Sequence, residues 1–270
     1  IVLDLLFVTV FHMGVFGAAF ATVLSQAISG VLCLIYIMKK ITLLHITRDD
    51  LQLSRQYVKN LIIMGFPMGF QYSITAIGSV ILQTAVNSLG STAVASMTAA
   101  SKISMFVVCP FDALGSTMAT YSGQNVGAGK FDRVKKGLVS ASLLGSIYAV
   151  AIFVVLFFSC NYLIYMFVSP DETEVIRQAH QFLLYNAAFY VPLVFVNTVR
   201  FAIQGMGFSG FAMFAGVAEM IARSLVGLAL VPVFGFSAAC FASPLAWIFA
   251  DSFLIPAFIH CLNKLKRTIS

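Results

Sequence analysis

Long apolar stretches, most of about twenty residues or more, follow one another along this chain and leave only short polar stretches between them. A stretch of that length crosses the ~30 Å hydrocarbon core of a bilayer as a helix. Strands of a membrane barrel would alternate polar and apolar residues, and these stretches do not. The pattern therefore predicts an all-α integral membrane protein. We expect a helix tail at 1–11 and spans at 17–38, 57–88, 92–121, 138–160, 177–206, 209–231 and 236–262.

Composition and charge agree with this interpretation, since 60% of the residues are hydrophobic and 10% are charged. The net charge of +6 alone would be compatible with a nucleic-acid partner, but the placement of the charges argues against one. Twelve of the sixteen basic residues lie in 39–59, in 123–137 or after residue 262, which are connections on one side of the predicted bundle. The positive-inside rule places that side in the cytoplasm. We therefore expect a multi-pass protein with a cytoplasmic C-terminus.

A weak internal repeat predicts two similar halves. Residues 14–24, GVFGAAFATVL, are similar to residues 235–245, GFSAACFASPL, and five positions are identical. The polar segment 39–59 then falls at the junction and is interpreted as a cytoplasmic linker. We expect 1–38 to hold the last helices of an N-terminal lobe and 60–270 to form a complete six-helix lobe. The rest of the N-terminal lobe would belong to the same polypeptide and would be missing from this chain.

Charged residues inside the expected spans are the main candidates for function. A charge at mid-bilayer costs roughly 2.5–3.5 kcal/mol on insertion scales, so each one should face protein or water. Glu219 and Arg223 are spaced for an ion pair within one helix. Arg200 should face the bundle or extend to the cytoplasmic surface. Asp112 and Asp251 are each interpreted as a proton site or as the partner of a basic residue.

Asp4 and Thr22 stand out because each lies about nine residues from a turn near residue 13. Two antiparallel helices would place them at similar depth, roughly 10 Å from the turn. A carboxylate and a hydroxyl at one depth supply oxygen ligands for a proton or Na⁺. The alternative is that Asp4 only hydrogen-bonds a neighbouring helix.

Polar side chains also gather in the span expected at 57–88. They indicate either the wall of a cavity or hydrogen bonds between helices. The cavity candidates are Gln71, Tyr72, Thr75 and Gln83. Four prolines are expected to interrupt spans, as in many transporters. These are Pro67, Pro110, Pro192 and Pro244.

Several segments together resemble the multidrug and toxic compound extrusion (MATE) transporters. The most specific is the run Gly123, Gln124, Asn125, Val126, Gly127, Ala128, Gly129, Lys130 with Arg133, which is similar to the signature after that family's eighth helix. Further similarity lies in Leu3–Phe7, in Met13–Thr22 with Ser25 and Gln26, in Glu219 with Arg223, and in Pro244–Trp247. The run Pro110–Gly115, PFDALG, is similar to a Firmicutes-type bacterial branch.

The resemblance implies a MATE-like bundle of twelve helices in two six-helix lobes, of which this chain would hold the end of the fifth helix through the twelfth. It implies export of drugs, organic cations or other amphipathic compounds across the plasma membrane, coupled to inward Na⁺ or H⁺ and needing no other cofactor. Asp4 and Thr22 match the Asp and Thr of the family's cation site in the N-terminal lobe. A second site on the seventh and tenth helices is not expected, because 57–88 and 175–206 contain no acidic residue.

Three other interpretations remain. A flippase for lipid-linked oligosaccharides, from the wider superfamily, should need basic cavity residues for pyrophosphate. A membrane enzyme would need a clustered nucleophile, metal or acid–base set at one depth, and the scattered cysteines and histidines form none. A scaffold without transport activity would have all of its intramembrane charges paired.

Overall fold

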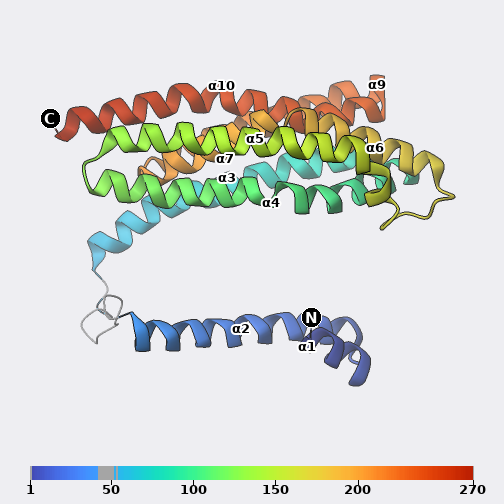
Figure 1. The fold of residues 1–270 in the computed structure, drawn as a ribbon, viewed down its shortest axis with the longest axis horizontal. Coiled ribbons are helices and arrows are strands. Elements are labelled where there is room, and N and C mark those ends of the chain that lie inside the picture. Colours follow the sequence, from blue (N-terminus) through green and yellow to red (C-terminus); the bar gives the residue numbers. More distant parts are fainter. Residues whose placement is uncertain (1, 42–51, 53, 270) are drawn as a thin grey trace. The chain divides into compact units, whose positions relative to one another are not determined.

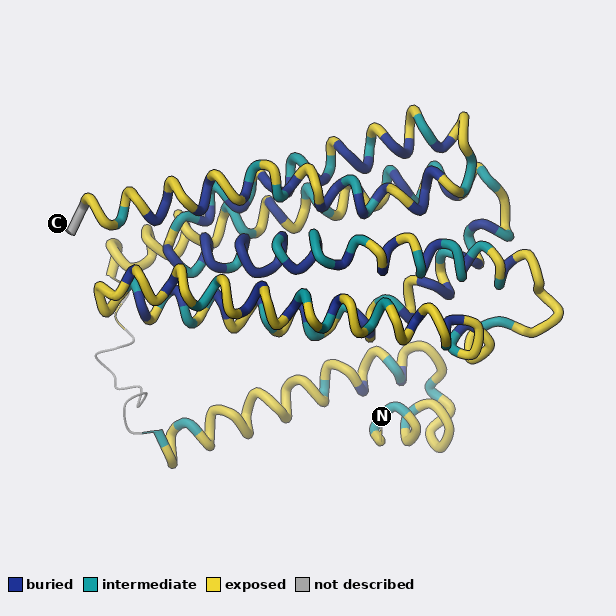
Figure 2. Tube along the Cα trace, turned by 45° about the horizontal axis from the view of Figure 1, so that its top comes forward, coloured by how far each residue is buried: buried dark blue, intermediate teal, exposed yellow. Residues whose placement is uncertain are grey.

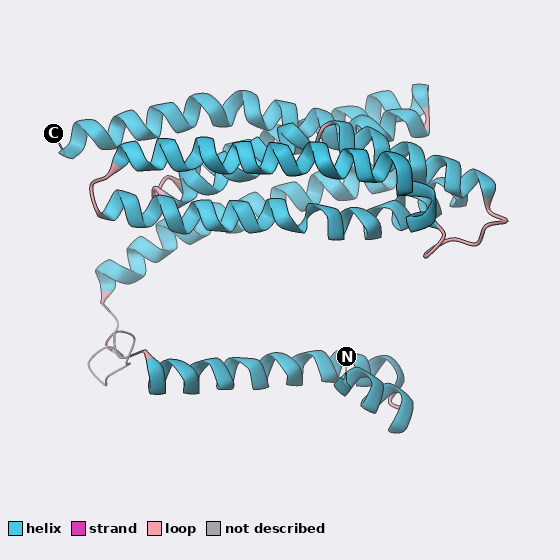
Figure 3. Ribbon diagram, in the orientation of Figure 1, coloured by secondary structure: helices cyan, strands magenta, loops and turns pink. Residues whose placement is uncertain are grey.

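The computed structural model describes residues 2–41, 52 and 54–269, and within them the regular structure is helical (Figure 3). The chain divides into two compact units, Ile1–Lys59 and Asn60–Ser270. Most of the predicted linker, residues 42–51 and 53, lies outside the described residues. The assignment of the two units to two transporter lobes stays a prediction.

The first unit is a helical hairpin. It consists of α1 (Val2–Leu5), the π-helical turn η1 (Leu6–Val10) and the long helix α2 (Gly14–Lys40) (Figure 1). The turn between them uses positive φ angles of 51° at His12 and 56° at Gly14. The two arms of the hairpin are in contact, because the ring of Phe7 in η1 meets the ring of Phe20 in α2 edge-on, with 5.4 Å between centroids.

The second unit is a bundle of long helices. It contains most of α3 (Arg55–Asn87) and all of α4 (Ser91–Gly127), α5 (Phe131–Ile164), α6 (Thr173–Ala188), α7 (Tyr190–Gly205), α8 (Ser209–Leu225), η4 (Val226–Leu230), α9 (Val231–Phe234) and α10 (Phe236–Ile269). In the described residues, six helical segments are long and apolar enough to cross a membrane, and α6 with α7 forms a seventh span if the two count as one. These segments correspond to the seven spans that the sequence predicted.

The span expected at 177–206 is not one straight helix. The chain bends by 54° between α6 and α7, at Phe189. Pro192 explains the break, because it has no N–H to donate to the preceding turn and its ring would collide with the carbonyl of residue 188 in a continuous helix. By contrast, α3, α4 and α10 run through Pro67, Pro110 and Pro244 without ending. The expectation that these three prolines interrupt their spans was therefore wrong.

Helix α7 lies at the centre of the second unit and packs against α4, α5, α8 and α10. Eleven of its sixteen residues are buried. Figure 2 shows how burial varies along the chain. Buried positions are concentrated inside the bundle, whereas most positions of α2 are exposed. Because α7 contacts so many helices, it determines where the polar side chains of the bundle interior meet.

The close approach of α7 to α4 depends on a glycine. A Cβ on Gly205 would overlap the backbone carbonyl of Ala119 in α4. We expect Gly205→Ala to lower the free energy of unfolding by about 1–3 kcal/mol, because two helix backbones must separate to admit the methyl group. Gly210→Ala is the matched control, since its Cβ would meet no atom within 4 Å. Titration of the purified chain with denaturing detergent measures both, and equal stabilities would contradict the prediction.

Candidate functional site

A network of charged side chains is buried between α7 and α8 of the second unit. Glu219 of α8 accepts a hydrogen bond from Nη2 of Arg200 in α7 through Oε1. Its other oxygen, Oε2, lies 3.4 Å from Nη2 of Arg223, one helical turn further along α8. All three residues are at least nine-tenths buried. One carboxylate therefore pairs with two guanidinium groups, and Arg200 faces the bundle instead of extending to the membrane surface.

The network continues at both ends with polar groups. Gln204 of α7 donates from Nε2 to Oε1 of Gln71 in α3, at 2.8 Å. On the other side, Asp251 of α10 lies close enough to Arg200 and Glu219 to interact with both electrostatically. Five buried atoms here have no hydrogen-bond partner among the described residues: Thr75 Oγ1, Arg200 Nε, Gln204 Oε1, Arg223 Nη1 and Asp251 Oδ1. With Asp251 ionised, the two acids and two arginines balance; with Asp251 neutral, one positive charge remains.

Small residues bring the helices of this network together. The buried side of α8 runs through Ala212, Gly216, Glu219 and Arg223, at intervals of three and four residues that place them on one face. A Cβ on Gly216 would lie 3.1 Å from Cγ of Gln71. The absence of that Cβ allows α8 to approach α3, as small residues do at helix contacts in membranes.

Helix α4 carries a second polar feature on its exposed face. One side of the helix is buried against α5, α6 and α7. The opposite side exposes a long series of polar residues, namely Ser91, Thr98, Ser101, Lys102, Asp112, Ser116, Thr117, Thr120 and Gln124. The exposed face of α5 is different, because its large side chains are apolar, as at Val139, Leu143 and Ile147. Among these two spans, only α5 therefore presents an apolar surface suited to lipid chains.

Two hollows lie along the polar face of α4. The larger, of about 770 Å³, is near the first turns of α4 and is lined by Ser91, Thr98, Lys102 and, from the α5–α6 connection, Glu172. The smaller, of about 450 Å³, is near the other end and is lined by Ser116, Thr117, Thr120, Tyr121 and Gln124. Exposed Met105 and Phe106 lie between the two groups of residues.

Asp112 lies between these hollows, on the exposed face and near the middle of α4. Its Oδ1 accepts a hydrogen bond of 3.1 Å from Nδ2 of Asn197, a buried residue of α7. The carboxylate is thus positioned from inside the bundle while its side chain stays accessible. Asp112 was a candidate from the sequence alone. Its partner Asn197 could not be predicted, because the two residues are 85 positions apart and meet only through the packing of α4 on α7.

The polar residues of α3 differ in burial and in hydrogen-bond partners. Gln71 is only 3% exposed and bonds to Gln204, so it joins helices and does not line a cavity. Thr75 is half-buried beside Gly216. Tyr72 is exposed, and Gln83 is half-buried and bonds to Asn87 one turn later in the same helix.

In the first unit, the register of the hairpin relates Asp4 to Thr22. Since Phe7 packs against Gly17 and Phe20, position 4 lies at the level of about residues 20–23 in α2. Asp4 is half-buried. The hydroxyl of Thr22 donates to the carbonyl of Ala18, at 3.0 Å. The role of these two residues in ion coupling stays a prediction.

The glycine-rich signature forms the last turns of α4 and the connection to α5. The buried Asn125 donates from Nδ2 to the carbonyl of Tyr121, and its own carbonyl accepts the amide of Lys130, both at 2.8 Å. Gly129 follows with φ of +69°. Gly123 packs close to the carbonyl of Gly205 in α7, whereas Gln124 is exposed and Gly127 ends the helix. The signature thus fixes a tight turn against α7.

The sequence of this chain is similar to a family model and to two curated proteins. The family model MatE matches residues 67–229. YpnP of Bacillus subtilis, a probable multidrug resistance protein, is 31% identical over 199 residues, covering 73% of this chain and 43% of YpnP. YoeA of the same organism, also a probable multidrug resistance protein, is 23% identical over 182 residues, covering 66% of this chain and 39% of YoeA. The chain spans less than half the length of these curated relatives.

Solved structures share the fold. A crystal structure of MATE in complex with MaL6 superposes with a TM-score of 0.90 at 19% identity, covering 98% of this chain and 60% of that chain. A MOP superfamily transporter from Pyrococcus furiosus superposes with a TM-score of 0.86 at 19% identity, covering all of this chain and 60% of that one. These likenesses confirm the all-α membrane fold that the apolar pattern predicted.

Proposed function

Because the chain belongs to the MATE family of membrane transporters, we propose that it is the C-terminal part of an exporter of drugs and other amphipathic or cationic compounds. The resemblance seen in the sequence is thereby confirmed, including its bacterial Firmicutes-type character, and the family consists of transporters and not enzymes. The proposed mechanism is alternating access, in which two lobes rock about a central site. The partners are the bilayer, the small-molecule substrate and the remainder of the N-terminal lobe.

The polar exposed face of α4 is the observation that carries this proposal. A helix that crosses a membrane cannot present Lys102 and Asp112 to hydrocarbon without a large cost. This face must therefore meet water or other protein, and in a transporter it forms one wall of the substrate pathway. The two hollows, with Met105 and Phe106 between them, give the wall a polar section toward each membrane surface and an apolar section in the middle.

The proposed orientation of the chain in the membrane follows from the placement of charge. We propose that the basic ends of α2, α5 and α10 lie in the cytoplasm, according to the positive-inside rule. Export against a gradient then requires an energy source, and the proposed source is inward H⁺ or Na⁺. Asp4 and Thr22 are the proposed ligands of that ion.

An Asp4→Asn substitution in the complete polypeptide tests the coupling. Reconstituted in vesicles, the unchanged transporter should move ethidium against its gradient when a H⁺ or Na⁺ gradient is imposed. The variant should lose ion-driven transport, because an amide cannot take up the proton or balance the cation. Asp171→Asn, which changes an exposed acid in the α5–α6 connection, is the control. Ion-driven efflux that survives in Asp4→Asn would disprove the role of Asp4.

The same vesicles separate the exporter from a flippase. A flippase should move a fluorescent lipid and not the dye. The structure gives that alternative little support, because Arg200 and Arg223 both pair with Glu219, and Lys102 is the one basic residue among those that line the two hollows described above. Lipid flipping without dye efflux would overturn the proposed function.

A further inference from the structure

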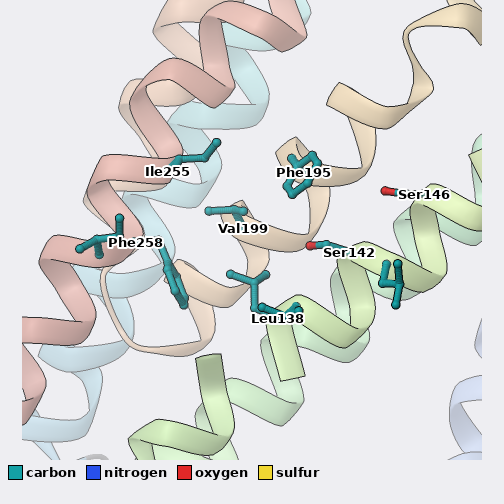
Figure 4. A pocket seen from close by; sticks show the side chains of 10 residues that line it. Leu138, Ser142, Ser146, Phe195, Val199, Ile255 and Phe258 are labelled. Carbon is teal, nitrogen blue, oxygen red and sulfur yellow. The ribbon is translucent and has the colours of Figure 1, made fainter. Parts of the chain in front are cut away.

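An apolar groove opens on the outer surface of the second unit, away from the polar face of α4. It encloses about 380 Å³ between α5, α7 and α10. Figure 4 shows Ser142 and Ser146 of α5 beside Phe195 and Val199 of α7, with Ile255 and Phe258 of α10 on the far side. The groove exists because α5 and α10 both pack on α7, while few residues join α5 to α10 directly.

The surroundings of the groove indicate that it lies among lipid chains. Val139 and Leu143 on the α5 side and Ile255 and Ile259 on the α10 side are all more than two-fifths exposed. Both helices are apolar enough to span a membrane. Ser142 does not make the groove hydrophilic, since it is buried and its hydroxyl lies 3.2 Å from that of Thr198. An aliphatic chain is therefore the occupant that the lining suits.

One end of the groove is positively charged. Lys135 precedes Val139 by four residues and Ser142 by seven, which places it on the groove face of α5. Lys266 follows Ile259 by seven residues and lies on the groove face of α10. Nζ of Lys266 is 2.7 Å from Oδ1 of Asp132, so this pair joins the two helices across the end of the groove. Asp132 neutralises only one of the two lysines.

The dimensions agree with a lipid. Lys135 and Ser146 are eleven residues apart, which corresponds to about 16 Å along a helix. A headgroup at Lys135 would therefore leave much of an acyl chain inside the groove. The charge calls for an anionic headgroup, because basic side chains at the cytoplasmic surface attract anionic lipids.

The geometry points to a binding site for one anionic phospholipid, with its phosphate at Lys135 and Lys266 and an acyl chain in the groove between α5, α7 and α10. This inference does not depend on the substrate or the coupling ion of the proposed exporter. It predicts a lipid that stays with the protein and is selected by both the headgroup and the chain.

Native mass spectrometry of the purified chain in mild detergent tests the site. The probes are phosphatidylglycerol and phosphatidylcholine with identical acyl chains. The unchanged protein should retain phosphatidylglycerol in preference. Lys135→Gln should weaken retention of phosphatidylglycerol about fivefold, the effect expected of one basic residue near a membrane surface. Arg133→Gln removes the same charge about two and a half turns from Ser142, on the opposite face, and should change nothing.

Ser146→Phe addresses the acyl chain, because the ring would occupy the groove without changing any charge. Retention of both lipids should fall in this variant. Equal retention of the two lipids by the unchanged protein, or equal losses in Lys135→Gln and Arg133→Gln, would overturn the site. So would a dimer in the same spectra that Ser146→Phe abolishes, since a second copy of the chain would then be the occupant. Lys135 and Arg133 are exposed, so those two variants keep the test independent of folding.

Discussion

Glu219→Leu will lower the free energy of unfolding by about 3–5 kcal/mol, the cost of removing one partner from a buried ion pair. The reason is that Arg200 and Arg223 would both remain buried without their shared carboxylate. Leucine fills most of the vacated volume, so the loss reports the charge and not a cavity. Unfolding of the purified chain by denaturing detergent, followed by circular dichroism, gives the measurement.

Two further variants make the interpretation specific. Glu174→Leu removes the carboxylate of an exposed pair with Arg177, at 2.6 Å, and should leave the stability nearly unchanged because exposed pairs contribute little. The triple variant Arg200→Met, Glu219→Leu, Arg223→Met should recover most of the loss, since an entire buried network can often be replaced by apolar residues at no cost. A triple variant less stable than Glu219→Leu would show that the arginines stabilise the bundle through other contacts.

The sequence predicted the helical part of this network and missed the tertiary part. Glu219 and Arg223 are four residues apart on one helix, so their pairing follows from helical geometry alone. Arg200 lies on another helix, and its distance from Glu219 depends on how α7 packs on α8. The bend at Phe189 affects that packing. The apolar pattern continues across Phe189 without a break, so it does not predict the angle of the bend.

The same limit applies to the polar faces. A list of polar residues in α3 could not separate Gln71, which faces α7, from Tyr72, which is exposed, because neighbours in a helix point about 100° apart and the orientation of the helix was unknown. On α4 the buried face is rich in small and apolar residues and the exposed face is rich in polar ones. The sequence of α4 shows which residues share each face, but one contact of the helix must be known to tell which face is buried. The packing of α4 against α7 provides that contact.

Asp112→Asn in the complete transporter will reduce efflux of a permanently charged cation, tetraphenylphosphonium, by about tenfold or more. A carboxylate about 4 Å from a cation contributes several kcal/mol at the effective dielectric of a protein surface, and part of this is lost to solvation of the free carboxylate. The variant should fold normally, because the carbonyl oxygen of asparagine can still accept the hydrogen bond from Asn197. Transport of an uncharged amphipathic substrate should fall much less.

The contrast between the two substrates distinguishes this role from others. If Asp112 contacts the substrate cation, only the charged compound is affected strongly, and Asn197→Leu should produce a smaller loss of the same kind by releasing the carboxylate from its position. If Asp112 instead carried the coupling proton, both substrates would lose ion-driven transport equally. Equal losses would therefore remove Asp112 from the substrate site, and unchanged transport of both would remove it from the pathway. An unchanged transporter that moves neither compound would contradict the proposed export function itself.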